Sequence, residues 1–237
     1  MPTMNSKLVQ FSIAAELEAH RPLWPAALLP PDRVEAACAA ASALPPIFHW
    51  LILEGRLSGD PQVDLMASLV DAPGVRRSVA AALERPQSPL IEGARPLLEA
   101  WARPAAHPHR RCMENTPVLW LEWDAPFDRP PFQLPCIDRR FWGDPSAPAA
   151  GVDELIEMIA DGYALTFGAP YPATTLALFR RVIAALPRGA RALAAASLRP
   201  RGVARERLFV SVPQALVLPW LDRVRWPGDL APLRAWP

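Results

Sequence analysis

The chain has little of what most specialised sites require. Its 237 residues contain eleven glycines, three cysteines and a single lysine, Lys7. With so little glycine, a phosphate-binding loop is hard to build, and the P-loop, the dinucleotide-binding GxGxxG and the zinc-binding HExxH motifs are all absent. No serine or cysteine occupies the GxSxG turn of hydrolases. We therefore expect no cofactor, and the motifs name no reaction.

Cysteine and targeting signals are equally sparse. Cys38, Cys112 and Cys136 are odd in number and far apart, which does not favour a secreted disulfide framework. The first ten residues lack the apolar core of a signal peptide. The uncharged stretch 36–53 is interrupted by two prolines and begins with alanines, so we expect no membrane span. These features predict a cytoplasmic protein.

No charge of one sign dominates. The net charge is +1, and acidic and basic residues are mixed along the chain, so we expect no nucleic-acid partner. What the chain does have is a 51% apolar composition with 21% charged residues, which is typical of a globular core. Its excess of alanine, arginine and proline is typical of a GC-rich genome, and we expect a bacterial protein.

Hydrophobic spacing predicts an α+β fold. A helical N-terminal layer, residues 1–110, precedes a ββα–αββα unit, residues 111–237, with a four-stranded, mostly antiparallel sheet. The boundary follows from residues 103–117, which lack apolar periodicity. The two parts are expected to pack together or to form one domain. The expected helices are 32–44, 61–70, 75–83, 89–101, 152–163, 176–186 and 217–224, and the expected strands are 118–124, 132–137, 191–198 and 207–212.

The strongest candidate site is a pair of carboxylates. Glu122 and Asp124 are two residues apart on a predicted strand, so they project from one face about 7 Å apart. Such a pair could act as acid and base, hold a divalent metal or bind a cationic ligand. The simpler alternatives are a solvated face or neutralisation by Arg207 across the sheet. Arg207 or Arg199 could also hold an anionic ligand.

Zinc is the other ligand chemistry that the sequence suggests. His107, His109 and Cys112 form H-x-H-x-x-C in the HPHRRC segment, with Cys136 as a fourth donor. The spacing matches no standard zinc site, and structural sites usually carry tight cysteine pairs, so we expect no metal.

Two functions remain open. The absence of a catalytic motif favours a non-catalytic binding or accessory protein in a bacterial pathway, with a protein or peptide partner. Trp142 and Trp120 are candidate recognition side chains, and the strand at 132–137 is expected to be an edge that accepts an added strand. The alternative is a small-molecule enzyme, an isomerase, cyclase or hydrolase, that uses Glu122 and Asp124 in a pocket between the helical layer and the sheet.

Overall fold

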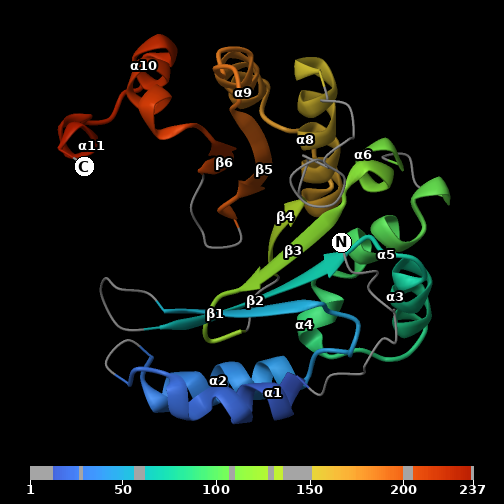
Figure 1. Ribbon diagram of the computed structural model, residues 1–237. Coiled ribbons are helices and arrows are strands. Elements are labelled where there is room, and N and C mark those ends of the chain that lie inside the picture. The colour runs from blue at the N-terminus through green and yellow to red at the C-terminus, as the bar shows by residue number, and fades with distance from the viewer. Residues whose placement is uncertain are drawn as a thin grey trace.

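The fold is mixed α+β, as expected. The computed structural model describes residues 13–26, 29–55, 62–106, 110–127, 131–135, 151–199 and 205–235. Strands β1 (Trp50–Gly55), β2 (Val63–Val70), β3 (Val118–Trp123) and β4 (Phe132–Pro135) form an antiparallel sheet in that order. Strands β5 (Arg191–Ser197) and β6 (Glu206–Ser211) form a second sheet, and β5 lies beside β4 (Figure 1).

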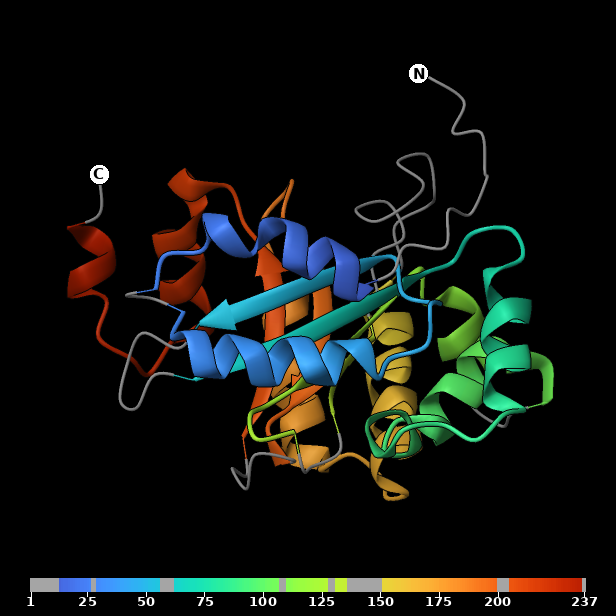
Figure 2. The same ribbon diagram turned by 90° about the horizontal axis from the view of Figure 1, so that it is seen from below.

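Helices cover the strands. Helices α1 and α2 lie beneath the four-stranded sheet in Figure 1 and in front of it in Figure 2, which is the view from below. No helix of the described part is long and apolar enough to cross a membrane. The described helices are α1 (Ile13–His20), α2 (Pro31–Ser42), α3 (Val75–Leu83), α4 (Pro89–Glu92), α5 (Arg95–Ala102), α6 (Arg110–Asn115), α8 (Val152–Phe167), α9 (Ala173–Ala184), α10 (Gln214–Val224), α11 (Ala231–Arg234) and the 3₁₀ turns η1 (Arg21–Leu23) and η2 (Pro104–Ala106).

The expected all-helical N-terminal layer is wrong. Residues 61–70 were expected to form a helix, but 63–70 form β2, and residues 50–55 form β1. β2 lies between β1 and β3 with both faces covered, so six of its eight residues are buried. A strand buried on both faces loses its polar alternation, and its apolar residues then also satisfy helical spacing.

The four strands that were expected to form one sheet do not all belong to the same sheet. Strands are present near all four expected places, as β3 to β6. Hydrogen bonding joins β3 and β4 to β1 and β2, whereas β5 pairs with β6. Strand pairing is a long-range property that the alternation of apolar residues within one strand does not encode.

Strand register divides the four-stranded sheet into two faces. One face, here called the Trp123 face, carries Leu65, Leu121 and Trp123 and packs against α1 to α5 in the main core. The other, called the Trp120 face, carries Trp120 and Glu122. Near Val118 and Trp120 this face packs against Ala194 and Ala196 of β5. The sheet therefore lies between a helical layer and the β5–β6 ribbon.

The expected helix at 152–163 is confirmed as the start of α8. Leu155, Ile156, Ile159 and Tyr163 are buried, whereas Glu157 is exposed. The helix packs mainly against α5, α6 and α9, in the same core that contains the Trp123 face. This core includes residues on both sides of residue 110, and the domain boundary there stays a prediction.

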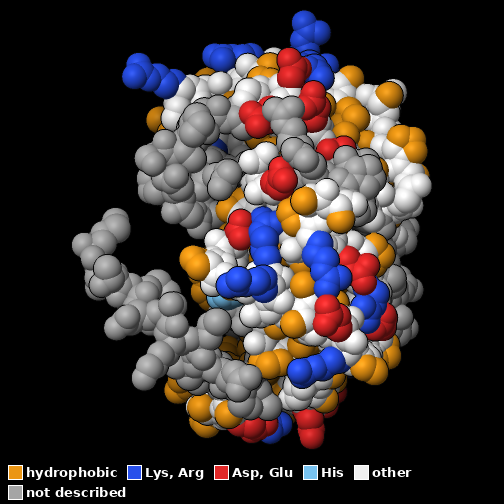
Figure 3. Space-filling model, turned by 90° about the vertical axis from the view of Figure 1, so that its right-hand side faces the viewer, with side chains coloured by type: hydrophobic (Ala, Val, Ile, Leu, Met, Phe, Trp, Pro, Cys, Tyr) orange, Lys and Arg blue, Asp and Glu red, His pale blue; other side chains and the backbone are white. Residues whose placement is uncertain are grey.

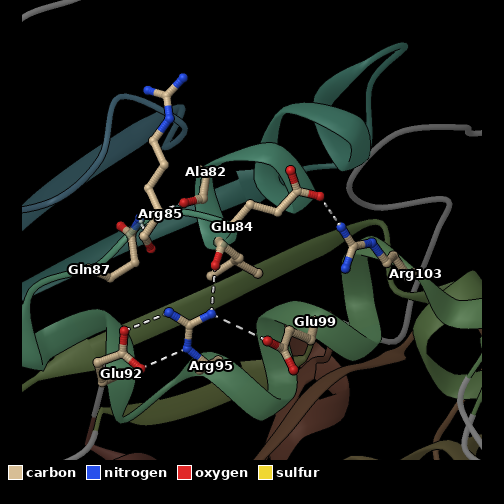
Figure 4. A network of polar contacts seen from close by, with 9 residues as sticks. Ala82, Glu84, Arg85, Gln87, Glu92, Arg95, Glu99 and Arg103 are labelled. Carbon is tan, nitrogen blue, oxygen red and sulfur yellow. Dashed lines mark hydrogen bonds and ion pairs between the residues drawn. The ribbon is translucent and has the colours of Figure 1, made fainter.

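Arginine side chains connect helices α3, α4 and α5 through hydrogen bonds and ion pairs. Arg95 binds Glu92 and Glu99 and donates to the Leu83 carbonyl oxygen at 2.7 Å, while Arg103 pairs with Glu84 (Figure 4). On the face drawn in Figure 3, acidic and basic side chains alternate rather than gather by sign. This charged network joins α3 to α5 and gives no single-signed surface.

Candidate functional site

The Trp120 face carries three cross-strand rows of side chains. Residues that pair in an antiparallel sheet project from the same face, so the register of β1 to β3 and its continuation define the rows. The first row is Trp50, Ser68 and Trp120; the second is Ile52, Met66 and Glu122; the third is Glu54, Asp64 and Asp124. Successive rows are about 7 Å apart along the strands. The face thus changes from aromatic in the first row to acidic in the third row.

The acidic end contains three carboxylates in close proximity. Oxygen atoms of Asp64, Glu122 and Asp124 all lie within 4.8 Å of one another. Asp64 is 2% exposed and Glu122 is 5% exposed, while Asp124 is half-buried. The amide of Ala125 donates a hydrogen bond of 3.0 Å to Asp64 Oδ1, which holds that carboxylate against the end of β3. The alternative of a solvated face is therefore wrong for Glu122.

Asp64 was not among the predicted site residues, because it falls in the segment 61–70 that was expected to be a helix. The alternating pattern Val63, Leu65, Ala67 and Leu69 was the signal that could have found it, since it puts Asp64 on the opposite face. Three carboxylates at this spacing offer the oxygen ligands that divalent cations prefer, or share protons in acid–base chemistry.

The aromatic end is partly open to solvent. The indole rings of Trp50 and Trp120 stack with centroids 5.9 Å apart and planes inclined by 27°. Trp120 is 9% exposed, whereas Trp50 is 48% and Ile52 is 44% exposed. Between the two indoles in the row, the Ser68 hydroxyl is buried and has no hydrogen-bond partner among the described residues. Recognition by this end would therefore use Trp50 and Ile52 more than Trp120.

Arg207 lies on a different sheet from the carboxylates. It is an exposed residue of β6, opposite Ala196, and so projects from the β5–β6 face that is turned toward Trp120. Phe209, 36% exposed, lies on the same face opposite Ala194. The described contacts include no ion pair between Arg207 and Glu122.

Arg199 belongs to a separate polar cluster on the other side of the β5–β6 ribbon. It pairs with Glu206 (Nε to Oε1, 3.4 Å) and lies over the Tyr163 ring at 5.6 Å. Tyr171 donates a hydrogen bond of 3.2 Å to Glu206 Oε2. Burial, and then the Glu206 carboxylate, raises the pKa of the Tyr171 hydroxyl, and burial raises the pKa of Tyr163. Glu206 is thus engaged by Tyr171 and Arg199, and the sequence did not bring this group together.

The candidate zinc ligands and Trp142 do not form a site in the described part of the chain. Trp142, His107, His109 and Cys136 lie outside the described residues. Cys112 is buried in α6 and its thiol donates to the Met158 carbonyl oxygen at 3.1 Å. Burial raises the pKa of this thiol to about 12, which makes it a poor nucleophile near neutral pH.

Comparison with known proteins gives no relative. No protein-family model, curated protein or solved structure matches the chain.

Proposed function

We propose that this protein is a non-catalytic binding or accessory protein that takes up an extended segment of a partner protein along β1. Within the described residues, β1 hydrogen-bonds to β2 and to no second strand. The observation that carries the proposal is the exposure of Trp50 and Ile52, two large apolar side chains on this edge strand. Composition supports a place in the cytoplasm of a bacterium.

An exposed apolar edge strand is a liability that soluble proteins usually avoid. Natural sheets protect their edges with lysine, proline, bulges or a covering element, because an open edge pairs with other chains. β1 contains no lysine and no proline, and its pairing with β2 is regular, without a bulge, from Trp50 to Gly55. Strand addition uses such an edge, with backbone hydrogen bonds for affinity and alternate side chains for specificity.

The accepting edge differs from the one predicted from the sequence. The strand at 132–137 was expected to be an edge, but β4 has β3 on one side and β5 beside it on the other. An added strand at β4 would therefore compete with β5. β1 lies at the opposite end of the same sheet, where the described part has no such neighbour.

A matched pair of substitutions tests this proposal. Ile52→Lys places a charge on the β1 edge, and Leu178→Lys places the same charge at an apolar side chain of α9 with the same 44% exposure. A partner captured from source cells and then purified should bind the wild type and the Leu178→Lys variant. It should not bind the Ile52→Lys variant. Hydrogen exchange should slow at β1 amides in the complex. Equal binding of the two variants would contradict the proposal.

Small-molecule catalysis is the second candidate function. It is favoured by one observation, the approach of Asp64 to Glu122 and Asp124. These carboxylates lie on the Trp120 face, away from α1 to α5, so a pocket that used them could not lie between the helical layer and the sheet as first expected. It would lie on the β5 side.

Glu122→Gln tests the second candidate, with Glu157→Gln on the exposed side of α8 as its control. Screening of small substrates should then reveal an activity that only the first variant loses, while circular dichroism shows both variants folded. An activity retained in Glu122→Gln and in Asp64→Asn would exclude the carboxylates from catalysis.

A further inference from the structure

Any strand added to β1 has its side chains positioned by the rows of the Trp120 face. Alternate residues of a paired strand project to the same side and lie beside their cross-strand neighbours. Every second residue of the added strand would therefore lie beside Trp50, then Ile52, then Glu54. The first two neighbours are apolar and exposed, and the third is an exposed carboxylate.

Charge in this sheet is of one sign. Strands β1, β2 and β3 contain no lysine or arginine, whereas they carry Glu54, Asp64 and Glu122, with Asp124 directly after β3. Arg56, which follows β1, lies outside the described residues. Glu54 pairs directly with Asp64, and the Asp64, Glu122 and Asp124 oxygens are mutually within 4.8 Å. A cation beside Glu54 would be attracted by its exposed carboxylate. An anion at the same place would be repelled.

We infer that the partner segment of the proposed function carries two apolar residues at alternate positions and an arginine or lysine two residues farther toward Glu54. This inference rests on strand addition at β1 and specifies its partner. If the added strand is antiparallel to β1, like the other neighbours in this sheet, its order is basic, apolar, apolar at every second residue. If it is parallel, the order is reversed.

Synthetic peptides and the full chain test the inference. The probes are fluorescent seven-residue peptides in which threonine alternates with arginine, valine and phenylalanine, in that order and in the reverse order. Each has a counterpart with glutamate in place of arginine. Fluorescence anisotropy should show, in at least one order, binding about tenfold tighter for arginine than for glutamate, because an attraction to Glu54 is exchanged for a repulsion. The difference should shrink in high salt.

Two substitutions assign the preference to its residues. Glu54→Gln should reduce the arginine preference, whereas Glu35→Gln, an exposed carboxylate of α2 across the sheet, should leave it unchanged. Ile52→Lys should weaken the arginine peptide most, because the added charge repels arginine while an apolar contact is lost from both peptides. Binding that depends on Ile52 but not on the peptide's charge would overturn this inference and leave the proposed function standing.

Two further outcomes would exclude a basic partner segment at β1 altogether. If no peptide binds, or if Ile52→Lys changes nothing, strand addition at β1 fails and the inference fails with it. If the protein is a dimer in sedimentation and Ile52→Lys makes it a monomer, a second copy of the chain occupies β1, and the basic partner segment is excluded.

Discussion

Arg76 connects three separate parts of the helical side of the protein. Its guanidinium donates to both carboxylate oxygens of Asp71 at 2.8 and 2.9 Å, to the Met113 carbonyl oxygen at 2.9 Å and to the Trp101 carbonyl oxygen. It also lies 4.6 Å over the Trp101 ring. One side chain from α3 thus holds the ends of α5 and α6, so Arg76→Ala should be among the most destabilising single changes outside the apolar core.

The magnitude follows from what the substitution leaves behind. Two backbone carbonyls lose a charged donor, at about 1–3 kcal/mol each where water cannot replace it. The cation–π contact adds about 0.5–1 kcal/mol. The Arg76 side chain is 19% exposed, so water reaches part of the site, and we expect a total near the low end, about 3 kcal/mol. At about 2–4 °C per kcal/mol, Tm should fall by about 6–12 °C.

The assay is urea unfolding followed by tryptophan fluorescence, with Arg77→Ala as the matched control. Arg77 is the next residue of α3 and is exposed, so its removal should change the free energy of unfolding by less than about 0.5 kcal/mol. Arg76→Lys should fall between them, because lysine keeps the charge but not the planar fork. A cost below about 1 kcal/mol for Arg76→Ala would refute the reasoning.

Three other predictions concern buried groups. Ile156→Ala on α8 should cost about 2–5 kcal/mol of unfolding free energy in denaturant melts, and Glu157→Ala less than about 0.5 kcal/mol; comparable costs would contradict the assigned faces. Ser68→Ala should be neutral or stabilising in the same melts, because it removes a buried hydroxyl without a described partner, and a loss above about 1 kcal/mol would reveal one. Burial raises the pKa of Cys112 from 9.0 to about 12, so the thiol stabilises the fold fully below pH 9 and this contribution is lost between about pH 9 and 12. Alkylation at pH 8 should spare Cys112 until the protein unfolds, and a Cys112→Ala variant should lose part of the alkaline destabilisation.

Local patterns in the sequence were enough for the elements that are amphipathic. The stripe that begins near Val152 predicted α8, because a helix with one apolar side has a single way to bury it. The alternation at 118–124 likewise predicted β3 and put Glu122 on the face opposite Trp123. These features depend only on neighbours within one element.

The central strand and the sheet partners were decided by tertiary structure. β2 is covered on both sides, so its apolar residues carry no period that distinguishes a strand from a helix, and Asp64 was assigned to a helix with them. The sequence also could not pair β3 with β2 rather than with the C-terminal strands, since a strand's side-chain pattern is compatible with many partners.

In the candidate site, too, some features follow from a single strand and others from tertiary packing. From the sequence alone, Glu122 and Asp124 were known to share a face, because side chains alternate along one strand. That Asp64 joins them, that Arg199 instead binds Glu206, and that Trp50 rather than Trp120 is exposed on an edge all depend on which segments pack together. Contacts between residues far apart in the chain arise from the whole packing of the core, and that packing is fixed only when every element is in place.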